Sequence, residues 1–348
     1  MRAGVIPVVL LLLASAAAPQ PVQAQSTLPA STPVQPSLTA GQAWQSVRQN
    51  FAAGAIATEM VDPSPGKQNL VLADQARDFY RRFPQDSRAR EARKLEVTAL
   101  LGATIDGNPA TEARLQAMAL AFESDSGNSE RDRAIVAGFH YFHVASRNIR
   151  RPADEPVLFE GVARRLMQEF PTQPQGYESL LTLAHRNDEA QSRALANELL
   201  GSAAADGVKA EAQKLLTQLG LKDCPLSSVA PALAGALAGK PAVIYVWASW
   251  SPDSLALAQM LGTRRLDAAT WIGLNVDDAS GQDAARKAAA AGQFPGQQMY
   301  DNRGMAGPLA ASLGVSSVPW VCLVDSQGVI RDVRGLDDLA TKLALWGL

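Results

Sequence analysis

The chain has few of the side chains on which most protein catalysis depends. Its 348 residues include two cysteines, three histidines and 6% aromatic residues. The cysteines, Cys224 and Cys322, are too far apart in the sequence for a zinc knuckle or a Cys-x-x-Cys redox pair. Three histidines cannot assemble a metal site without carboxylates beside them. We therefore expect neither a bound metal nor a cofactor.

The chain also lacks an excess of charge of either sign. It carries 32 Lys and Arg against 34 Asp and Glu, a formal net charge of −2. This balance gives no reason to expect nucleic acid or an anionic membrane as a partner. The hydrophobic fraction of 47% is ordinary for a globular protein, and the length suggests two domains.

Long apolar runs are confined to the N-terminus. Arg2 is followed by an apolar stretch from Val5 to Leu13, too short to span a bilayer, and Val22-Gln23-Ala24 offers small residues for cleavage. We predict that residues 1–24 are a signal peptide cleaved after Ala24; an uncleaved anchor is the alternative. The sequence thus predicts a periplasmic or secreted protein with no integral membrane segment after cleavage.

The residue composition changes after the predicted signal peptide. Residues 25–38 hold three prolines among Ser, Thr and Gln, which predicts a disordered Pro/Ser/Thr-rich linker. From residue 39 to 219 apolar residues recur at three- and four-residue spacing, which indicates helices that each need a partner helix. The clearest stripes are Leu72, Ala76, Phe79, Tyr80 and Phe83; Leu158, Val162, Leu166 and Phe170; and Val208, Ala212, Leu215, Leu216 and Leu219.

Two of the predicted helices end in the same way, at Phe83-Pro84 and Phe170-Pro171. Because proline breaks a helix, each pair predicts a helix, a tight turn and a second helix. This resembles tetratricopeptide-type repeats, although their Trp, Leu-Gly and Tyr signature is missing and the spacing is not one repeat length. We expect an irregular stack of helical hairpins that is a binding surface or a spacer.

His140 and His143 are three residues apart on a predicted helix and therefore share one face. A metal or catalytic role needs a carboxylate or cysteine nearby, which the sequence does not place. An aromatic-rich core or interface face is the interpretation that we favour.

After residue 219 the pattern changes to alternating strands and helices. Ala242 to Ala248 is a continuous apolar run typical of a buried strand, and Ser251, Pro252 and Asp253 are typical of a helix start. Alternation that ends in a hairpin and a helix predicts a mixed sheet flanked by helices, an α/β domain after an all-α domain. Further strands are expected at 271–276, 298–300, 315–324 and 329–333, and further helices at 282–291, 306–313 and 336–346.

Several short motifs in this region occur in an ordered series. Trp247-Ala248-Ser249-Trp250 follows the first strand, and the later motifs are Phe294-Pro295, Tyr300-Asp301, Leu313-Gly314-Val315, Ser317-Val318-Pro319 and Leu323-Val324-Asp325 with Gly328 and Ile330. The series resembles a thioredoxin-like domain of the extracytoplasmic TlpA and ResA kind of thiol-disulfide oxidoreductase. The resemblance covers about residues 220–348 and implies a thioredoxin fold.

The family's Trp-Cys-x-x-Cys signature falls on Trp250, Ser251 and Ser254 in this chain. A cysteine at a helix N-terminus has a lowered pKa and forms a reactive thiolate, whereas a serine can neither ionise there nor exchange a disulfide. A nucleophilic Ser251 would require a histidine, and all three lie in the helical region. We therefore interpret Ser251 as a helix cap and predict no catalytic residue.

Val318-Pro319 corresponds in the resemblance to a cis-proline that faces the redox turn. The resemblance implies an extended peptide or protein partner docked between Trp250 and Pro319. A purely structural role in shaping the start of a strand is equally open.

The two cysteines leave a second set of alternatives open. Cys322 lies in a predicted central strand and is expected to be a buried small hydrophobe, or to form a disulfide with Cys224. Our leading interpretation is a redox-inactive thioredoxin-like protein that serves as a binding or scaffold module. The alternative is an extracytoplasmic oxidoreductase or peroxidase-like enzyme that uses Cys224 and Cys322; a third possibility places the function in the helical domain.

Overall fold

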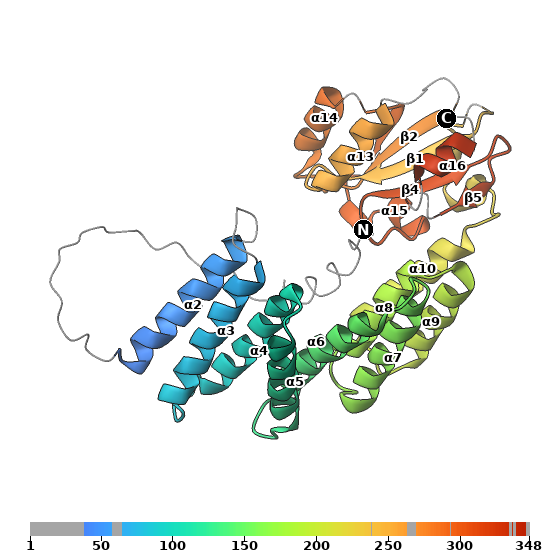
Figure 1. Ribbon diagram of the computed structural model, residues 1–348. Helices are drawn as coiled ribbons and strands as arrows, with labels where there is room; N and C mark the ends of the chain where they lie inside the picture. The colour runs from blue at the N-terminus through green and yellow to red at the C-terminus, as the bar shows by residue number, and fades with distance from the viewer. Residues whose placement is uncertain are drawn as a thin grey trace, which may run out of the picture. The chain divides into compact units, whose positions relative to one another are not determined.

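The structure is a computed structural model that describes residues 38–57, 65–237, 239–262, 269–292, 294–333, 336 and 339–345. The predicted signal peptide, and the predicted linker up to residue 37, lie outside these residues. The chain forms two compact units that divide between Ser179 and Leu180. A helical region precedes an α/β region, as the sequence predicts (Figure 1).

The first unit is built from helices that pack on their neighbours in sequence. Contacts join α2 to α3, α3 to α4, α4 to α5, α5 to α6 and α6 to α7 (Figure 1). Leu100, Leu115 and Phe122 are among the buried residues of the core that these helices share. The elements are α2 (Ala40–Ala57), α3 (Pro65–Arg82), α4 (Ala89–Ala103), the 3₁₀ turn η1 (Thr104–Asp106), α5 (Pro109–Ser124), α6 (Glu130–Asn148) and α7 (Asp154–Glu169).

Turn signals in the sequence coincide with helix ends. Asn108 caps α5, because its side-chain oxygen accepts the Ala110 N–H at 2.9 Å and Pro109 takes the first helical position. Ser129 caps α6 by accepting the Asp132 N–H at 3.1 Å. Helices α3 and α7 end directly before Phe83-Pro84 and Phe170-Pro171. The helical hairpins are therefore confirmed, and their tetratricopeptide-like character stays a prediction.

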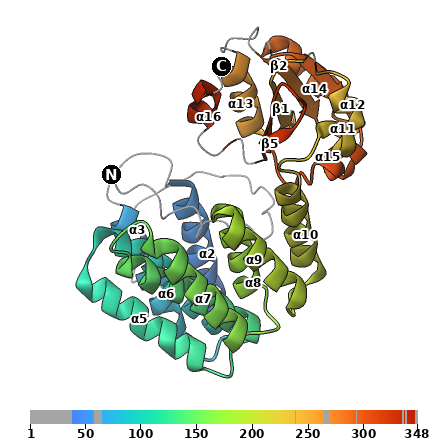
Figure 2. The same ribbon diagram turned by 90° about the vertical axis from the view of Figure 1, so that its right-hand side faces the viewer.

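The second unit contains the end of α8, the helices that follow it and a five-stranded sheet. The strand order is β3-β2-β1-β4-β5, with β1, β2 and β3 parallel and β4 antiparallel to both β1 and β5. Figure 2 shows β1, β2 and β5 of this sheet. The strands are β1 (Ala242–Trp247), β2 (Thr270–Asn275), β3 (Gln297–Tyr300), β4 (Trp320–Val324) and β5 (Ile330–Asp332). The helices are α8 (Gln175–Arg186), α9 (Glu189–Gly201), α10 (Asp206–Gly220), α11 (Leu226–Val229), α12 (Pro231–Ala234), α13 (Pro252–Gly262), α14 (Gln282–Ala291), η2 (Gly304–Ala306), α15 (Pro308–Ser312) and α16 (Leu339–Leu345).

The sheet is covered on both faces. All six residues of β1 are buried, which explains its unbroken apolar sequence. One core joins the sheet to α11, α12 and α15, and the other joins it to α13, α14 and α16. The phenol of Tyr245 is a polar group on this strand, and it donates to the Pro295 carbonyl at 2.8 Å. A tyrosine is tolerated in the central strand because its hydroxyl has a partner.

Three details differ from the sequence-based expectation. The short helices α11 and α12 were not predicted, since four residues are too few for a helical period to be read. The helix expected at 306–313 is divided into η2 and α15 by Gly307, whose extended conformation interrupts the turn. The closing helix begins at Leu339 rather than Leu336.

Helix α10 approaches the sheet domain at Gly314. This glycine has φ +64°, and a Cβ there would lie 2.9 Å from the Lys214 carbonyl oxygen and 3.0 Å from the Gln218 nitrogen. Both atoms belong to the backbone of α10, so the close approach requires glycine. The compact unit therefore includes α10, whereas the sequence-based domain boundary at residue 219 stays a prediction.

Candidate functional site

The Ser-x-x-Ser turn, from Ser251 to Ser254, joins β1 to α13 at one end of the sheet. Trp247 pairs with Asn275 of β2, and Val246 pairs with Trp320 of β4. The segments that follow β1 and β2 and the segment that precedes β4 therefore meet at the same end. This arrangement brings Trp250 and the Val318-Pro319 bond to one edge of the fold.

Ser251 caps α13, as the sequence predicts. Its Oγ accepts the Ser254 N–H at 3.2 Å, and its carbonyl oxygen accepts the Leu255 N–H at 3.2 Å. Pro252 follows at the first helical position and Asp253 adds a negative charge to the first turn. The hydroxyl of Ser251 is thus engaged in capping the helix.

Ser254 lies one helical turn deeper. Its side chain is fully buried, and Oγ has no hydrogen-bond partner among the described residues. Burying an unpaired hydroxyl costs free energy, whereas a thiol of similar shape behaves as a small hydrophobic group and is buried at little cost. The buried position of Ser254 therefore suits a thiol better than a hydroxyl.

No proton acceptor of the serine-hydrolase kind is available in this part of the chain. The sequence from residue 186 to 348 contains no histidine. A serine hydroxyl needs an adjacent base to become a nucleophile, so Ser251 and Ser254 lack the partner of a Ser-His pair.

A buried carboxylate fixes the loop before the Ser-x-x-Ser turn. Asp277 is 2% exposed and follows β2; its Oδ2 accepts the Ser249 N–H at 2.8 Å and its Oδ1 accepts the Ser249 hydroxyl at 2.7 Å. Asn275 also donates to Asp277 Oδ2. Sequence reasoning missed this residue, although polar side chains directly after a buried strand are a usable signal.

The surface beside the turn combines an exposed indole with a cis peptide bond. Trp250 is 62% exposed, and the Val318-Pro319 bond is cis. Val318 and Pro319 are half-buried, and the next residue, Trp320, is buried as the first residue of β4. Large exposed aromatic side chains are typical contact points for protein partners.

Both cysteines are free thiols in the structure, so the alternative in which Cys224 and Cys322 form a disulfide is not observed. Cys224 bonds to β5, where its carbonyl oxygen accepts the Ile330 N–H at 2.9 Å, and β5 in turn pairs with β4, which contains Cys322. Two strand spacings amount to about 10 Å, which is beyond the ~7 Å that a disulfide can bridge between α-carbons. Burial, with a smaller effect of the Asp332 charge, raises the pKa of the Cys322 thiol far above its ordinary value.

The two histidines of the helical unit have carboxylate partners on α5. His140 Nδ1 lies 2.9 Å from Glu123 Oε1, and His143 Nε2 lies 2.8 Å from Glu112 Oε2. Each histidine thus has a separate partner, and among the described residues no group of three potential metal ligands occurs. The favoured interpretation of a packed face agrees with this geometry.

Comparison with known proteins gives relatives for the C-terminal portion of the chain. No family model matches the sequence. Over 93 residues the chain is 34% identical to the thiol:disulfide interchange protein DsbE of Yersinia pestis and 32% identical to that of Escherichia coli K12. The match covers 27% of this chain and 47% and 48% of the relatives, so the chain spans about half the length of the curated relatives it matches.

The similar solved structures are also disulfide oxidoreductases, and their TM-scores against this chain are low. A secreted disulfide oxidoreductase of Mycobacterium tuberculosis is 21% identical, with a TM-score of 0.27 and coverage of 32% of this chain and 85% of its own. A C-terminal domain of a thiol-disulfide oxidoreductase from Bacteroides thetaiotaomicron is 20% identical, with a TM-score of 0.28 and coverage of 31% and 76%. The C-terminal portion of the chain is therefore similar in sequence to thiol:disulfide interchange proteins.

Proposed function

We propose that the thioredoxin-like domain is a redox-inactive binding module for protein partners outside the cytoplasm. The observation that carries the proposal is the pair of hydroxyls in the Ser-x-x-Ser turn. Ser251 caps α13 and Ser254 is buried within it, at the two positions that the resemblance assigns to the reactive cysteines. Serine cannot form or exchange a disulfide, so the reaction of the related proteins has no nucleophile here.

The partner that we propose is an extended peptide segment docked beside the turn. Trp250 supplies an exposed aromatic surface, and the half-buried Val318 and Pro319 lie at the same end of the sheet. Asp277 holds the loop that carries Trp250, since it binds both polar groups of Ser249. A rigid aromatic anchor reduces the entropy lost on binding.

The oxidoreductase alternative relies on Cys224 and Cys322, and their placement argues against it. Cys322 is fully buried in β4 and its pKa is raised by burial, so it is protonated at neutral pH. Cys224 donates its S–H to the Gly220 carbonyl at 3.3 Å and lies two strands away. Cys322 is inaccessible, and Cys224 has no second thiol within disulfide reach to act as a resolving partner.

The proposed location outside the cytoplasm rests on the predicted signal peptide and on the secreted character stated for one structural neighbour. Within the described residues, no helix has both the length and the hydropathy needed to cross a membrane.

Reduction of insulin by dithiothreitol, followed by turbidity, tests the proposal. The matched control is the double variant Ser251→Cys with Ser254→Cys, which restores the family's motif at its own positions. We expect the wild-type chain to leave the uncatalysed rate unchanged and the double variant to accelerate it. Equal acceleration by wild type and the double variant, with loss of wild-type activity in Cys322→Ala, would overturn the proposal in favour of the enzyme.

A further inference from the structure

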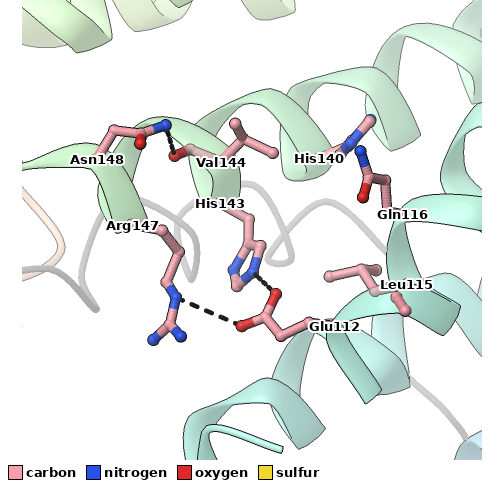
Figure 3. A pocket seen from close by; sticks show the side chains of 9 residues that line it. Glu112, Leu115, Gln116, His140, His143, Val144, Arg147 and Asn148 are labelled. Carbon is pink, nitrogen blue, oxygen red and sulfur yellow. Dashed lines mark hydrogen bonds and ion pairs between the residues drawn. The ribbon is translucent and has the colours of Figure 1, made fainter. Parts of the chain in front are cut away.

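The helical unit contains a groove that the proposed function does not use. Two adjoining cavities of about 370 and 420 Å³ share Gln116, His140, Val144 and Asn148, and together form one groove along α6 between α5 and α7. Figure 3 shows the end of this groove at which Glu112, His143 and Arg147 meet. Volumes of this size fall in the range of protein ligand sites.

The floor of the groove is a single stripe of α6. His140, Val144 and Asn148 are four residues apart and lie on one helical face. Eight residues of helix rise by about 12 Å, the length of roughly four residues of extended peptide. The α7 wall is open at Gly161, where an added Cβ would meet no atom within 4 Å. The groove therefore has the dimensions of a short extended segment.

The lining combines apolar contact with amide groups. Val144 is 43% exposed, and Leu158, Gly161 and Ala113 add apolar surface beside it. The amide of Asn148 uses Nδ2 to donate to the Val144 carbonyl at 2.9 Å, which leaves Oδ1 to accept. Side-chain amides both donate and accept, as peptide backbone does.

One end of the groove presents an arginine with donors to spare. Arg147 is 55% exposed, and its Nε lies 3.4 Å from Glu112 Oε1. Glu112 is 26% exposed and its other oxygen is held by His143. The guanidinium of Arg147 is therefore more exposed than the carboxylate of Glu112. Among the described residues, its two terminal nitrogens have no hydrogen-bond or ion-pair partner. A planar fork of this kind matches a carboxylate.

The other end carries a second, more fully occupied arginine. Arg165 binds Glu169 through Nε at 2.8 Å and donates to the Tyr141 hydroxyl at 3.0 Å. Its guanidinium also stacks on the Tyr141 ring, 3.7 Å from the centroid. Arg165 is 54% exposed against 37% for Glu169, so this end too faces outward as a cation, with fewer free donors than Arg147.

We propose that this groove binds an extended, apolar segment of a partner protein that carries an acidic residue at the Arg147 end. The apolar surface of Val144, Leu158 and Ala113 holds the middle of the segment. The amides of Gln116 and Asn148 bond to its backbone, and Arg147 binds its carboxylate. The site is independent of the Ser-x-x-Ser turn, because its residues all lie in the first compact unit.

Fluorescence anisotropy with labelled hexapeptide mixtures tests the proposal on the full chain. The mixtures are Glu-X-X-X-X-Glu, Gln-X-X-X-X-Gln and Lys-X-X-X-X-Lys, where X is an equal mixture of Ala, Val, Leu and Ile. We expect the Glu mixture to bind at least tenfold more tightly than the Lys mixture and to weaken as salt rises. Equal binding of the three mixtures, or binding of none, would overturn the proposal.

Variants locate the binding within the groove. We expect Arg147→Glu to weaken the Glu mixture at least tenfold and Arg165→Glu to weaken it less. Arg164→Glu makes the same charge change one residue away and should leave binding within twofold. Gly161→Trp fills the open wall and should abolish binding, whereas Gly161→Ala should not. An effect of Arg164→Glu as large as that of Arg147→Glu would point to charge alone and reject the site; circular dichroism confirms that each variant is folded.

Discussion

Ser249 gives both of its polar hydrogens to one carboxylate, the buried Asp277. This contact ties the loop after β1 to the loop after β2, directly before the Ser-x-x-Ser turn. The position of Trp250 thus depends on a residue that is 27 positions further along the chain.

Asp277→Ala should destabilise the α/β domain. The change removes the acceptor of the Ser249 N–H, the Ser249 hydroxyl and the Asn275 amide. Leaving these donors unpaired should lower the free energy of unfolding by about 1 to 3 kcal/mol. Urea denaturation measures the free energy of unfolding. Asp283→Ala, an exposed carboxylate on α14, is the control and should change stability by less than about 0.5 kcal/mol. Equal effects of the two substitutions would contradict a stabilising role for the contact between Asp277 and Ser249.

The burial of Cys322 predicts a specific dependence on pH. In the folded chain its pKa is raised, whereas in the unfolded chain it titrates near 8.5. Unfolding therefore releases a proton above that pH, so stability is full below it and is lost as pH rises. Between pH 7.5 and 9.5 the wild type should lose about 1.4 kcal/mol relative to Cys322→Ala, in which this group is missing. Parallel pH profiles of the two chains, measured by urea denaturation, would argue against the burial.

Thiol accessibility gives a direct companion measurement. A disulfide reagent added to the native chain should label Cys224 and leave Cys322 unreacted, because one thiol is half-buried and the other fully buried. Unfolding in guanidinium should release the second thiol. Rapid labelling of both thiols in the native chain would revive the oxidoreductase alternative.

Glu96 is the buried charge on which the first unit depends. Its side chain is fully buried, receives Arg114 Nε at 2.9 Å and accepts the Tyr80 hydroxyl at 2.7 Å. Burial and this hydrogen bond raise the pKa of Tyr80 to about 12. Glu96→Ala removes one partner of a buried pair and should cost about 3 to 5 kcal/mol in chemical denaturation. Arg82→Ala breaks an exposed pair and should cost less than about 1 kcal/mol; similar losses would contradict the difference in burial.

Trp250→Ala should separate binding from stability. The indole is 62% exposed, so its removal should leave the melting temperature within about 2 °C of wild type. Capture of proteins from an extracytoplasmic extract should fall at least fivefold if the surface is a contact site. Trp271→Ala removes a buried indole and leaves a cavity, so it is expected to lower stability instead. Unchanged capture by Trp250→Ala would remove this surface from the proposed function.

The sequence predicts the elements better than their contacts. The apolar run of β1, the cap at Ser251 and the Phe-Pro helix ends are local patterns, and each is confirmed. The partner of Ser249 is not local, because the register of β1 on β2 decides which polar residue reaches it. The carboxylates opposite His140 and His143 depend in the same way on how α5 lies against α6.

The glycine at position 314 sets a limit on how the chain can be divided. Its backbone packs directly against the backbone of α10, so α10 and the loop that contains Gly314 form one packed contact. Cutting the chain at residue 220 would expose, on each fragment, a surface that is buried in this contact. Loss of partner capture by such a fragment could then result from misfolding and not from removal of the binding site. A cut in the turn between α7 and α8 keeps α10 and Gly314 in one fragment and breaks no helix, so it is the better way to ask which part of the chain holds the partner.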